Sequence, residues 1–174
     1  MGASLSGLAG QFSVFGFKGT GKSTGLVGYF YDIKQTNKRT PMPGFSNEMY
    51  ASTMKEFTEK WDIHILDKFY RSETALMTPY VYVPNGDSQL AAKAFGEDKH
   101  CHGSHWIVHY RGQVTAPKSG TFRFIGVGDN TLVVGLNEKI VLDGGNPHVV
   151  APSMNTERSV GPGGPNWPMA AGAW

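Results

Sequence analysis

The stretch from Tyr110 to Asp143 constrains the fold more than any other part of this 174-residue chain. Apolar residues alternate along it with smaller or polar ones, which is the period of two that a half-buried sheet requires. Turn residues interrupt the alternation at 117–120 and 126–130, and Asn137 with Glu138 predicts a two-residue hairpin loop. We therefore predict three closely spaced antiparallel strands, with the alternating residues Val114, Phe122, Phe124, Leu132 and Val134.

Three further segments have the composition of strands. The segment 26–34 is rich in aromatic and β-branched residues, which favour a strand. Shorter patterns of the same kind predict strands at 79–83 and at 105–114. Together with the stretch above, they indicate a mainly β, antiparallel fold.

Two segments have the period of a helix. Between Ser46 and Trp61, apolar residues are spaced four, three and four apart, which places them on one helix face. A shorter helix is predicted at 87–95, capped by Asp87 or Ser88. We expect one or two helices inserted among the strands.

Composition divides the chain into three parts. Residues 1–25 form a Gly/Ser-rich N-terminal arm, 26–145 form the folded domain, and 146–174 form a Gly/Pro-rich tail. The net charge of +2 is too small to indicate nucleic acid or an anionic membrane as a partner. We find no apolar stretch long enough to span a membrane and no basic region preceding a signal-like segment.

The order of residues in the last third resembles the PA14 domain. The similarity lies in Gly112-x-Val114-x-x-Pro117, in the run Ser119–Phe124, and in the corner Gly128-Asp129-Asn130. The earlier run Gly28–Asp32 is similar to the first strand of such domains, and GYFYDIKQT resembles a subgroup of secreted bacterial proteins. This resemblance implies an antiparallel β-sandwich that acts in adhesion, glycan binding or surface assembly.

The same resemblance implies a calcium site at the Asp129–Asn130 corner. Members that bind carbohydrate hold Ca²⁺ there between adjacent carboxylates, and the ion then takes hydroxyl groups of the sugar. Asn130 replaces the second carboxylate and supplies an oxygen without the charge, while Asp143 could add a carboxylate. Trp106 joins Asp129 and Asn130 as a candidate ligand-binding residue; the alternative is a strand from which Trp106 packs inward. The alternative for the corner is a turn in which Asp129 bonds its own backbone.

Phe12, Val14, Phe15 and Phe17 make the N-terminal arm apolar in an otherwise Gly/Ser-rich setting. Exposed Phe side chains would form an adhesive patch, so we expect them to be buried. The prediction is an added edge strand, from the same chain or a neighbouring copy, with Phe15 and Phe17 on one face and Val14 on the other. This arm favours a homo-oligomer or surface assembly.

Two other motifs offer different chemistry. The run from Gly16 to Ser23 fits the phosphate-binding pattern G-x-x-x-x-G-K-[ST], with Lys22 as its lysine, but the following residues favour a strand where that loop requires a helix. His100, Cys101, His102, His105 and His109 could bind zinc or copper. In a strand, however, His105 and His109 would lie ~13 Å apart, too far to share one ion.

The sequence therefore predicts a non-enzymatic PA14-like module for surface assembly or adhesion, located outside the cell or on its surface. A calcium-dependent glycan-binding module is the first alternative, and a nucleotide-binding protein is the second. We find no arrangement of a nucleophile with a His and an acid that would indicate catalysis.

Overall fold

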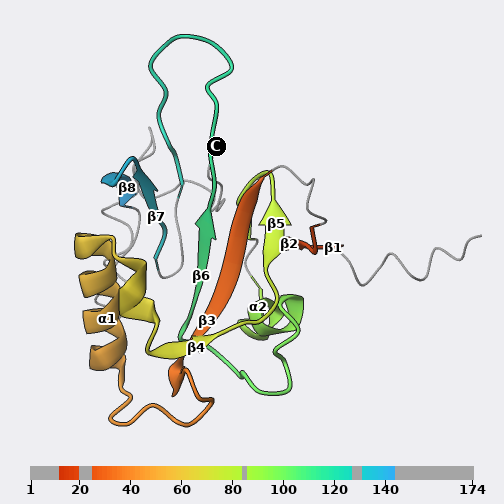
Figure 1. Ribbon diagram of the computed structural model, residues 1–174, viewed down its shortest axis with the longest axis vertical. Helices are drawn as coiled ribbons and strands as arrows, with labels where there is room; N and C mark the ends of the chain where they lie inside the picture. Colours follow the sequence, from red (N-terminus) through yellow and green to blue (C-terminus); the bar gives the residue numbers. More distant parts are fainter. Residues whose placement is uncertain (1–11, 20–24, 84–85, 127–130, 144–174) are drawn as a thin grey trace, which may run out of the picture.

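The computed structural model describes residues 12–19, 25–83, 86–126 and 131–143, which form two antiparallel sheets and two α-helices (Figure 1). This confirms a mainly β, antiparallel architecture with two short helices. In chain order the elements are β1 (Phe12–Ser13), β2 (Gly16–Phe17), β3 (Leu26–Thr36), α1 (Asn47–Lys60), the 3₁₀ turn η2 (Ile63–Leu66), β4 (Phe69–Arg71), β5 (Leu76–Thr78), α2 (Gln89–Ala94), β6 (Trp106–Arg111), β7 (Val133–Leu136) and β8 (Lys139–Asp143).

Strand β3 is the centre of the larger sheet. Val27 pairs with Met77 of β5 and also with Arg111 of β6, so these two strands lie on opposite sides of β3. Tyr31 likewise pairs with both β4 and β6. Strands β5 and β4 therefore follow one another along one edge of β3, and β6 pairs with the other edge from Val27 to Asp32.

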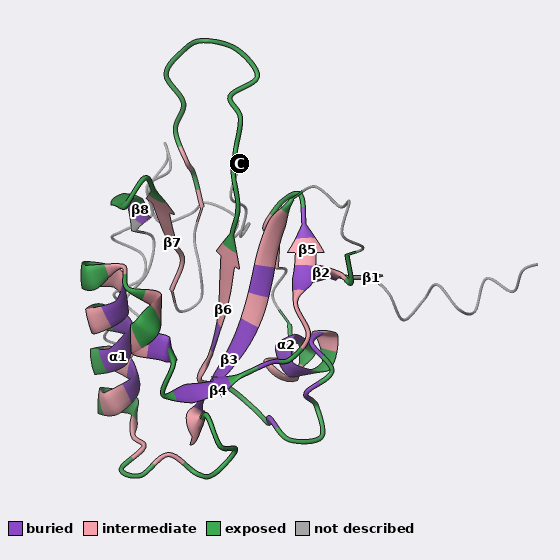
Figure 2. Cartoon of the chain, in the orientation of Figure 1, coloured by how far each residue is buried: buried purple, intermediate pink, exposed green. Residues whose placement is uncertain are grey.

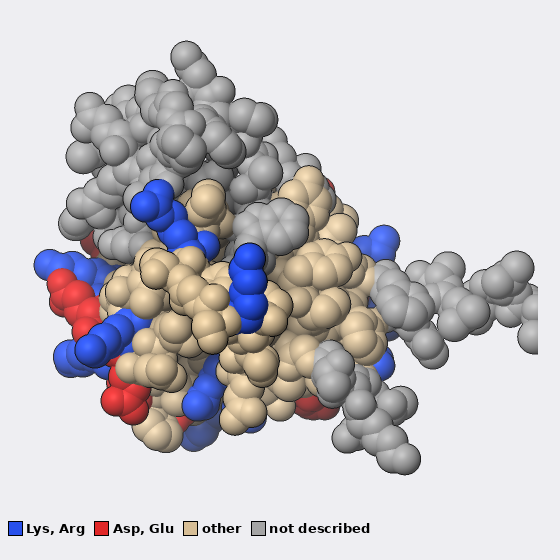
Figure 3. Space-filling view, turned by 90° about the horizontal axis from the view of Figure 1, so that it is seen from above, with Lys and Arg blue, Asp and Glu red and all other residues tan. Residues whose placement is uncertain are grey.

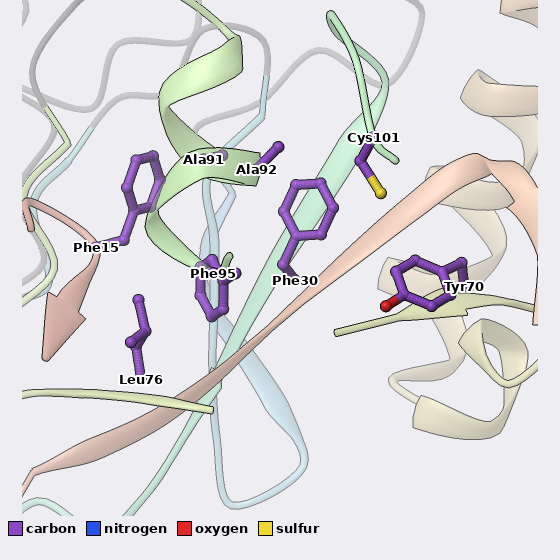
Figure 4. Close-up of a cluster of buried hydrophobic side chains, with 8 residues drawn as sticks. All are labelled: Phe15, Phe30, Tyr70, Leu76, Ala91, Ala92, Phe95 and Cys101. Atoms are coloured by element: carbon purple, nitrogen blue, oxygen red, sulfur yellow. The ribbon is translucent and has the colours of Figure 1, made fainter. Parts of the chain in front are cut away.

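Alternate residues of β3 point to opposite faces, and a helix covers each face (Figure 1). Buried residues concentrate in β3, in β4 and on the inner side of α1 (Figure 2). The α1-side core consists of Tyr31, Ile33, Tyr50, Met54, Phe57, Leu66, Phe69 and Ile107. The α2-side core, drawn in Figure 4, consists of Phe15, Phe30, Tyr70, Leu76, Ala91, Ala92, Phe95 and Cys101.

Helix α1 matches the prediction for 46–61. The Ser46 hydroxyl caps it by accepting a hydrogen bond of 3.2 Å from the Met49 N–H. The helix ends at Trp61, which adopts a left-handed conformation with φ of 50° and stacks on Phe57, the ring centroids lying 5.7 Å apart. The Trp61 indole lies against Gly135 of β7, because a Cβ at position 135 would come within 2.4 Å of the indole ring.

The short helix at 87–95 is also present, as α2. Of the two predicted capping residues, Asp87 acts: its carboxylate accepts a hydrogen bond of 2.9 Å from the Gln89 N–H. The Ser88 side chain makes no capping bond. The helix therefore begins with an Asx-type turn.

The hairpin loop at Asn137 and Glu138 is confirmed. Both residues have positive φ, 49° and 64°, and they connect β7 to β8. This is the twist that a two-residue hairpin loop requires.

Two strand predictions were wrong. The strand expected at 79–83 lies earlier, as β5, since Pro79 lacks the N–H that a sheet interior uses. The strand expected at 119–124 is absent, and 112–126 runs as an extended excursion beyond the end of β6 (Figure 1). Val114 and Phe122, predicted as core, are 62% and 53% exposed. An alternating pattern becomes a strand only when a neighbouring strand supplies hydrogen bonds, and no described strand pairs with this segment.

Candidate functional site

The predicted calcium corner falls on residues that the structure does not describe. Asp129 and Asn130 lie outside the described residues. The backbone of Asp143 pairs with Val133 at the end of β8. Among the residues that are described, no group of three or more His, Cys, Asp or Glu side chains is placed to hold a metal ion.

Trp106 packs inward. Its ring lies 6.0 Å from the Phe15 ring in an edge-to-face arrangement and 6.2 Å from the Phe30 ring. The indole N–H donates a hydrogen bond of 3.0 Å to the Ser88 carbonyl. These contacts occupy both the apolar ring and its single donor in packing α2 against the sheet, which matches the inward-packed alternative for this residue.

The phosphate-loop motif leads into a strand. Lys22 and Ser23 lie outside the described residues, while Gly16 belongs to β2 and pairs with Ser13. After Gly25 the chain enters β3, eleven residues of strand. A phosphate loop holds its ligand at a helix N-terminus, and the element that follows this motif is not a helix.

The histidines are held apart by aromatic packing. His105 has ring contacts with Phe45 and Tyr50, both with centroids 5.2 Å away, and bonds the Asn47 side chain at 2.9 Å. His109 packs instead on the Phe57 ring, 5.6 Å away. The two imidazole rings therefore pack against different residues, His105 near the start of α1 and His109 near its end.

The N-terminal arm folds against its own chain. Residues 12–17 form a tight hairpin rather than one strand, and β2 adds to the edge of the sheet by pairing Phe17 with Met77. Gly16 makes this approach possible, because at its φ of 121° a Cβ would lie 2.4 Å from the Met77 carbonyl oxygen. The backbone of Phe12 pairs with Phe17 in the same hairpin.

Phe15 is the residue of the arm that enters the core. It is 2% exposed and makes edge-to-face contacts with Phe95 and Trp106, whereas Val14 beside it is 42% exposed. The expected single strand, with Phe15 and Phe17 on one face, is corrected: Val14 and Phe15 occupy the turn, and the turn directs Phe15 inward. The Ser13 hydroxyl holds this turn by accepting from the Phe15 N–H at 3.1 Å and donating to the Gly16 carbonyl at 3.0 Å.

A buried polar network lies beside the α2-side core, and sequence reasoning did not find it. Asp32 is fully buried, and its carboxylate pairs with the Lys34 ammonium at 2.7 Å and accepts from the Gln35 amide at 2.8 Å. The Cys101 thiol lies next to it; burial and the Asp32 charge raise the pKa of this thiol to about 12. A protonated thiol is a poor nucleophile, so the network is suited to holding structure.

What the network holds is the loop before β6. The Gln35 amide also donates to the His100 carbonyl at 2.7 Å, and the Lys34 ammonium donates to the Ser104 carbonyl. From the other side, the Gln89 amide donates to the Cys101 carbonyl at 2.8 Å. Strand β3 and helix α2 thus fix the same loop, which sets where β6 begins.

A segment with exposed apolar residues follows β6. The structure records no pairing for the outer edge of β6 within the described residues, so its outward N–H and C=O groups have no described strand partner. The chain then continues as 112–126, where Val114, Phe122 and Ile125 are all exposed. We call the outer edge of β6 together with the segment 112–126 the β6 extension.

Comparison with known proteins identified no relative of this chain. No protein-family model matches this chain, and no curated protein or solved structure is significantly similar to it. Within the described part of the chain, no helix has the length and apolar character to cross a membrane.

Proposed function

We propose that this chain is a non-enzymatic, PA14-like module that self-associates in surface assembly or adhesion, at the cell surface or outside the cell. The observation that carries the proposal is the β6 extension. It combines a strand edge without a described partner and a segment in which the apolar residues Val114, Phe122 and Ile125 are exposed. Long edges and apolar patches of this kind are sites of association in soluble proteins.

The occupant we propose for this edge is a second copy of the chain. The segment that follows β6 has the alternation of a strand, in the run from Thr121 to Ile125, but has no described strand beside it. Two copies could supply each other with the missing partner, as in strand addition. Burial of one Phe such as Phe122 would contribute roughly 1.5–3 kcal/mol to such an interface.

In this proposal the PA14-like sandwich is completed around β7 and β8. This hairpin already packs on the end of α1 through Gly135 and Trp61. Its exposed apolar residues, Leu136, Ile140 and Val141, would belong to the second layer. The sequence resemblance of 110–143 to PA14 domains supports this arrangement.

The non-enzymatic part of the proposal is supported by how the buried reactive groups are used. The carboxylate of Asp32 is satisfied by Lys34 and Gln35, and the Cys101 thiol is kept protonated. These are the groups from which a buried active site would be built, and here they fix a loop.

Light scattering coupled to size exclusion, over a range of protein concentrations, tests the proposal. We expect the full chain to associate, and Phe122→Ser combined with Ile125→Ser to shift it toward monomer. Thr121→Pro should act in the same direction, because proline removes a donor from the proposed strand. Val14→Ser combined with Leu90→Ser is the matched control, since these two side chains are 42% and 43% exposed and lie elsewhere.

Two outcomes would overturn the proposal. One is a chain that stays monomeric at every concentration; the other is equal dissociation by the control pair. A monomer that binds glycans only when calcium is present, and loses this binding in Asp129→Ala, would establish the glycan-binding alternative in its place.

A further inference from the structure

A hollow of about 140 Å³ opens on the face of the sheet that α1 covers only in part. It lies beside η2 on this face of the sheet, and residues of β3, β4 and β6 form its floor. The residues that line it are Val27, Tyr29 and Tyr31 of β3, Arg71 of β4, His109 and Arg111 of β6, and Ile63 of η2.

The strand register explains why these side chains meet. On β3, Tyr29 and Tyr31 are two residues apart and point to one face. Across the sheet, Tyr29 pairs with His109 and Tyr31 pairs with Arg71, and paired residues of antiparallel strands share a face. Helix α1 and η2 bury Tyr31 but leave Tyr29 only partly buried, so the hollow is the uncovered end of the α1-side core.

Two guanidinium groups give the hollow a positive charge. Arg71 lies 4.9 Å from the centroid of the Tyr29 ring, and it lies close enough to Tyr31 to oppose the rise in that phenol's pKa that burial causes. Neither Arg71 nor Arg111 forms an ion pair within the described residues. By contrast, the acidic and basic side chains of α1 alternate and pair, as seen on the α1 side of the molecule (Figure 3).

His109 adds a polar group to the lining of the hollow but no charge, so it does not change the positive charge of the two arginines. Burial, and then the neighbouring Arg111, lower the pKa of His109 to about 4, so its imidazole is neutral near pH 7. No hydrogen bond of this ring is recorded within the described chain; its ring contact there is with Phe57. A neutral imidazole can donate to a ligand oxygen without requiring a carboxylate of its own.

We infer that this hollow binds a carboxylate carried on a six-membered ring, as in an aromatic acid or a sugar acid. Arginine forks match the two oxygens of a carboxylate, and Tyr29 with Val27 offers an apolar wall for the ring. The volume is similar to the cavity of about 150 Å³ that accommodates benzene in an engineered protein.

Comparison with a neighbouring hollow also favours the smaller hollow as the site for an acid. It is larger, about 430 Å³, and shares Tyr31 and Arg71, but its lining includes the carboxylates of Asp67 and Glu73. Those two charges would repel an anion. We therefore expect an acid to bind in the hollow of about 140 Å³, which is lined by Arg71 and Arg111 and by no carboxylate.

Titration calorimetry on the full chain, at constant ionic strength, tests the inference with benzoate and glucuronate. Benzyl alcohol and glucose are their neutral counterparts. We expect one acid or both to bind at least about tenfold more tightly than the neutral counterpart, since hydrogen bonds to charged groups contribute more than neutral ones. The relative affinity of benzoate and glucuronate then identifies whether the ring is aromatic or a sugar.

Charge-removing variants locate the site. Arg71→Gln and Arg111→Gln should each weaken binding about tenfold or more, while Arg123→Gln, which removes the same charge from the segment 112–126, should leave it unchanged. Circular dichroism checks that Arg71→Gln remains folded, and Arg111→Gln provides a second variant at another exposed position. Failure of this inference and failure of the proposed self-association are distinguishable, because the first is read from acid binding and the second from the molecular mass at increasing protein concentration.

Any of the following results would overturn it. The first is absence of binding by both acids at tens of millimolar. The second is equal binding of acids and their neutral counterparts, or an equal loss in Arg123→Gln. The third is inorganic sulfate binding as tightly as either ring acid, which would show a simple ion site without a place for a ring.

Discussion

The phenol of Tyr110 donates a hydrogen bond of 2.7 Å to the backbone carbonyl of Phe15, 95 residues earlier in the chain. The Tyr110 ring reaches it by lying across Gly28, its partner in the β3–β6 register; a Cβ at position 28 would come within 2.3 Å of that ring. One side chain thus joins β6, on one edge of β3, to the N-terminal hairpin beyond the other edge.

Tyr110→Phe should lower the free energy of unfolding by about 0.5–1.5 kcal/mol, because it removes this bond and keeps the ring. It should also speed proteolysis within the N-terminal hairpin, residues 12–17, which the bond ties down. Urea unfolding and limited proteolysis measure the two effects. Tyr82→Phe, at a ring that is 46% exposed, is the control, and equal effects of the two changes would contradict the role given to the bond.

Two adjacent residues of the hairpin turn should differ sharply when truncated. Phe15→Ala should cost about 3–5 kcal/mol, the range for a buried aromatic ring, because it empties the space between Phe95 and Trp106. Val14→Ala should change the unfolding free energy by less than about 0.5 kcal/mol, since its side chain faces solvent. Similar melting temperatures for both variants would mean that the hairpin does not pack as described.

The exposure of Phe122 revises the stability expected from the sequence. The alternating pattern predicts a core residue and a loss of about 2–5 kcal/mol on truncation. In the single chain Phe122 is 53% exposed, so Phe122→Ala should leave the stability of dilute protein nearly unchanged, whereas Phe30→Ala should cost about 3–5 kcal/mol. Chemical unfolding at low and high protein concentration checks this; a loss for Phe122→Ala that appears only at high concentration would place the ring in an interface.

We predict that His109 makes the stability of the fold sensitive to acid. Its folded pKa is depressed to about 4 from 6.5, so between these values the unfolded chain binds a proton that the folded chain does not. Stability is therefore complete above about pH 6.5 and falls as the pH drops toward about 4, by up to about 1.4 kcal/mol per pH unit. His109→Phe should flatten this part of the curve of unfolding free energy against pH.

His105 and His64 also affect that curve, and His64 supplies a control for it. Burial also lowers the pKa of His105, which adds to the acid loss, whereas Asp67 raises the pKa of His64 and opposes it. His64→Gln should therefore make the acid loss steeper. A His109→Phe curve that matches the unmutated protein would contradict the buried, neutral imidazole.

Cys101 should be almost inert to alkylation. With a pKa raised to about 12, its thiol is protonated at pH 8, and it is 1% exposed. Iodoacetamide should modify it only on unfolding, and mass spectrometry reads this without ambiguity because the chain contains one Cys. Asp32→Asn should accelerate labelling, while Glu73→Gln, at an exposed carboxylate, should not; rapid labelling of the unmutated protein would contradict the buried network.

Local patterns were enough to predict the elements whose residues depend on near neighbours. Helix α1 is specified by the spacing of its apolar residues, and the β7–β8 loop by a residue pair that accepts positive φ. Strand β3 follows from β-branched and aromatic composition. In each case the physical cause lies within a few residues along the chain.

The missed features depend on partners distant in sequence. The alternation in 119–124 describes a strand but cannot supply the neighbouring strand that would pair with it. Burial of Phe15 in the arm was expected, but its contacts with Phe95 and Trp106 could be seen only once the sheet brought them together. Likewise, nothing near Cys101 in the sequence indicates that Asp32, on a strand nearly seventy residues earlier, lies beside its thiol.

The contact between Trp61 and Gly135 gives this protein a built-in optical probe. The indole sits where the end of α1 meets the β7–β8 hairpin, and indole emission changes wavelength and intensity when its surroundings gain or lose water. Displacement of the β7–β8 hairpin would therefore shift the emission spectrum of Trp61, and no attached dye is needed to detect it. Since Trp106 is held in the α2-side core, a Trp61→Phe variant would separate the signal of the hairpin from that of the remaining tryptophans.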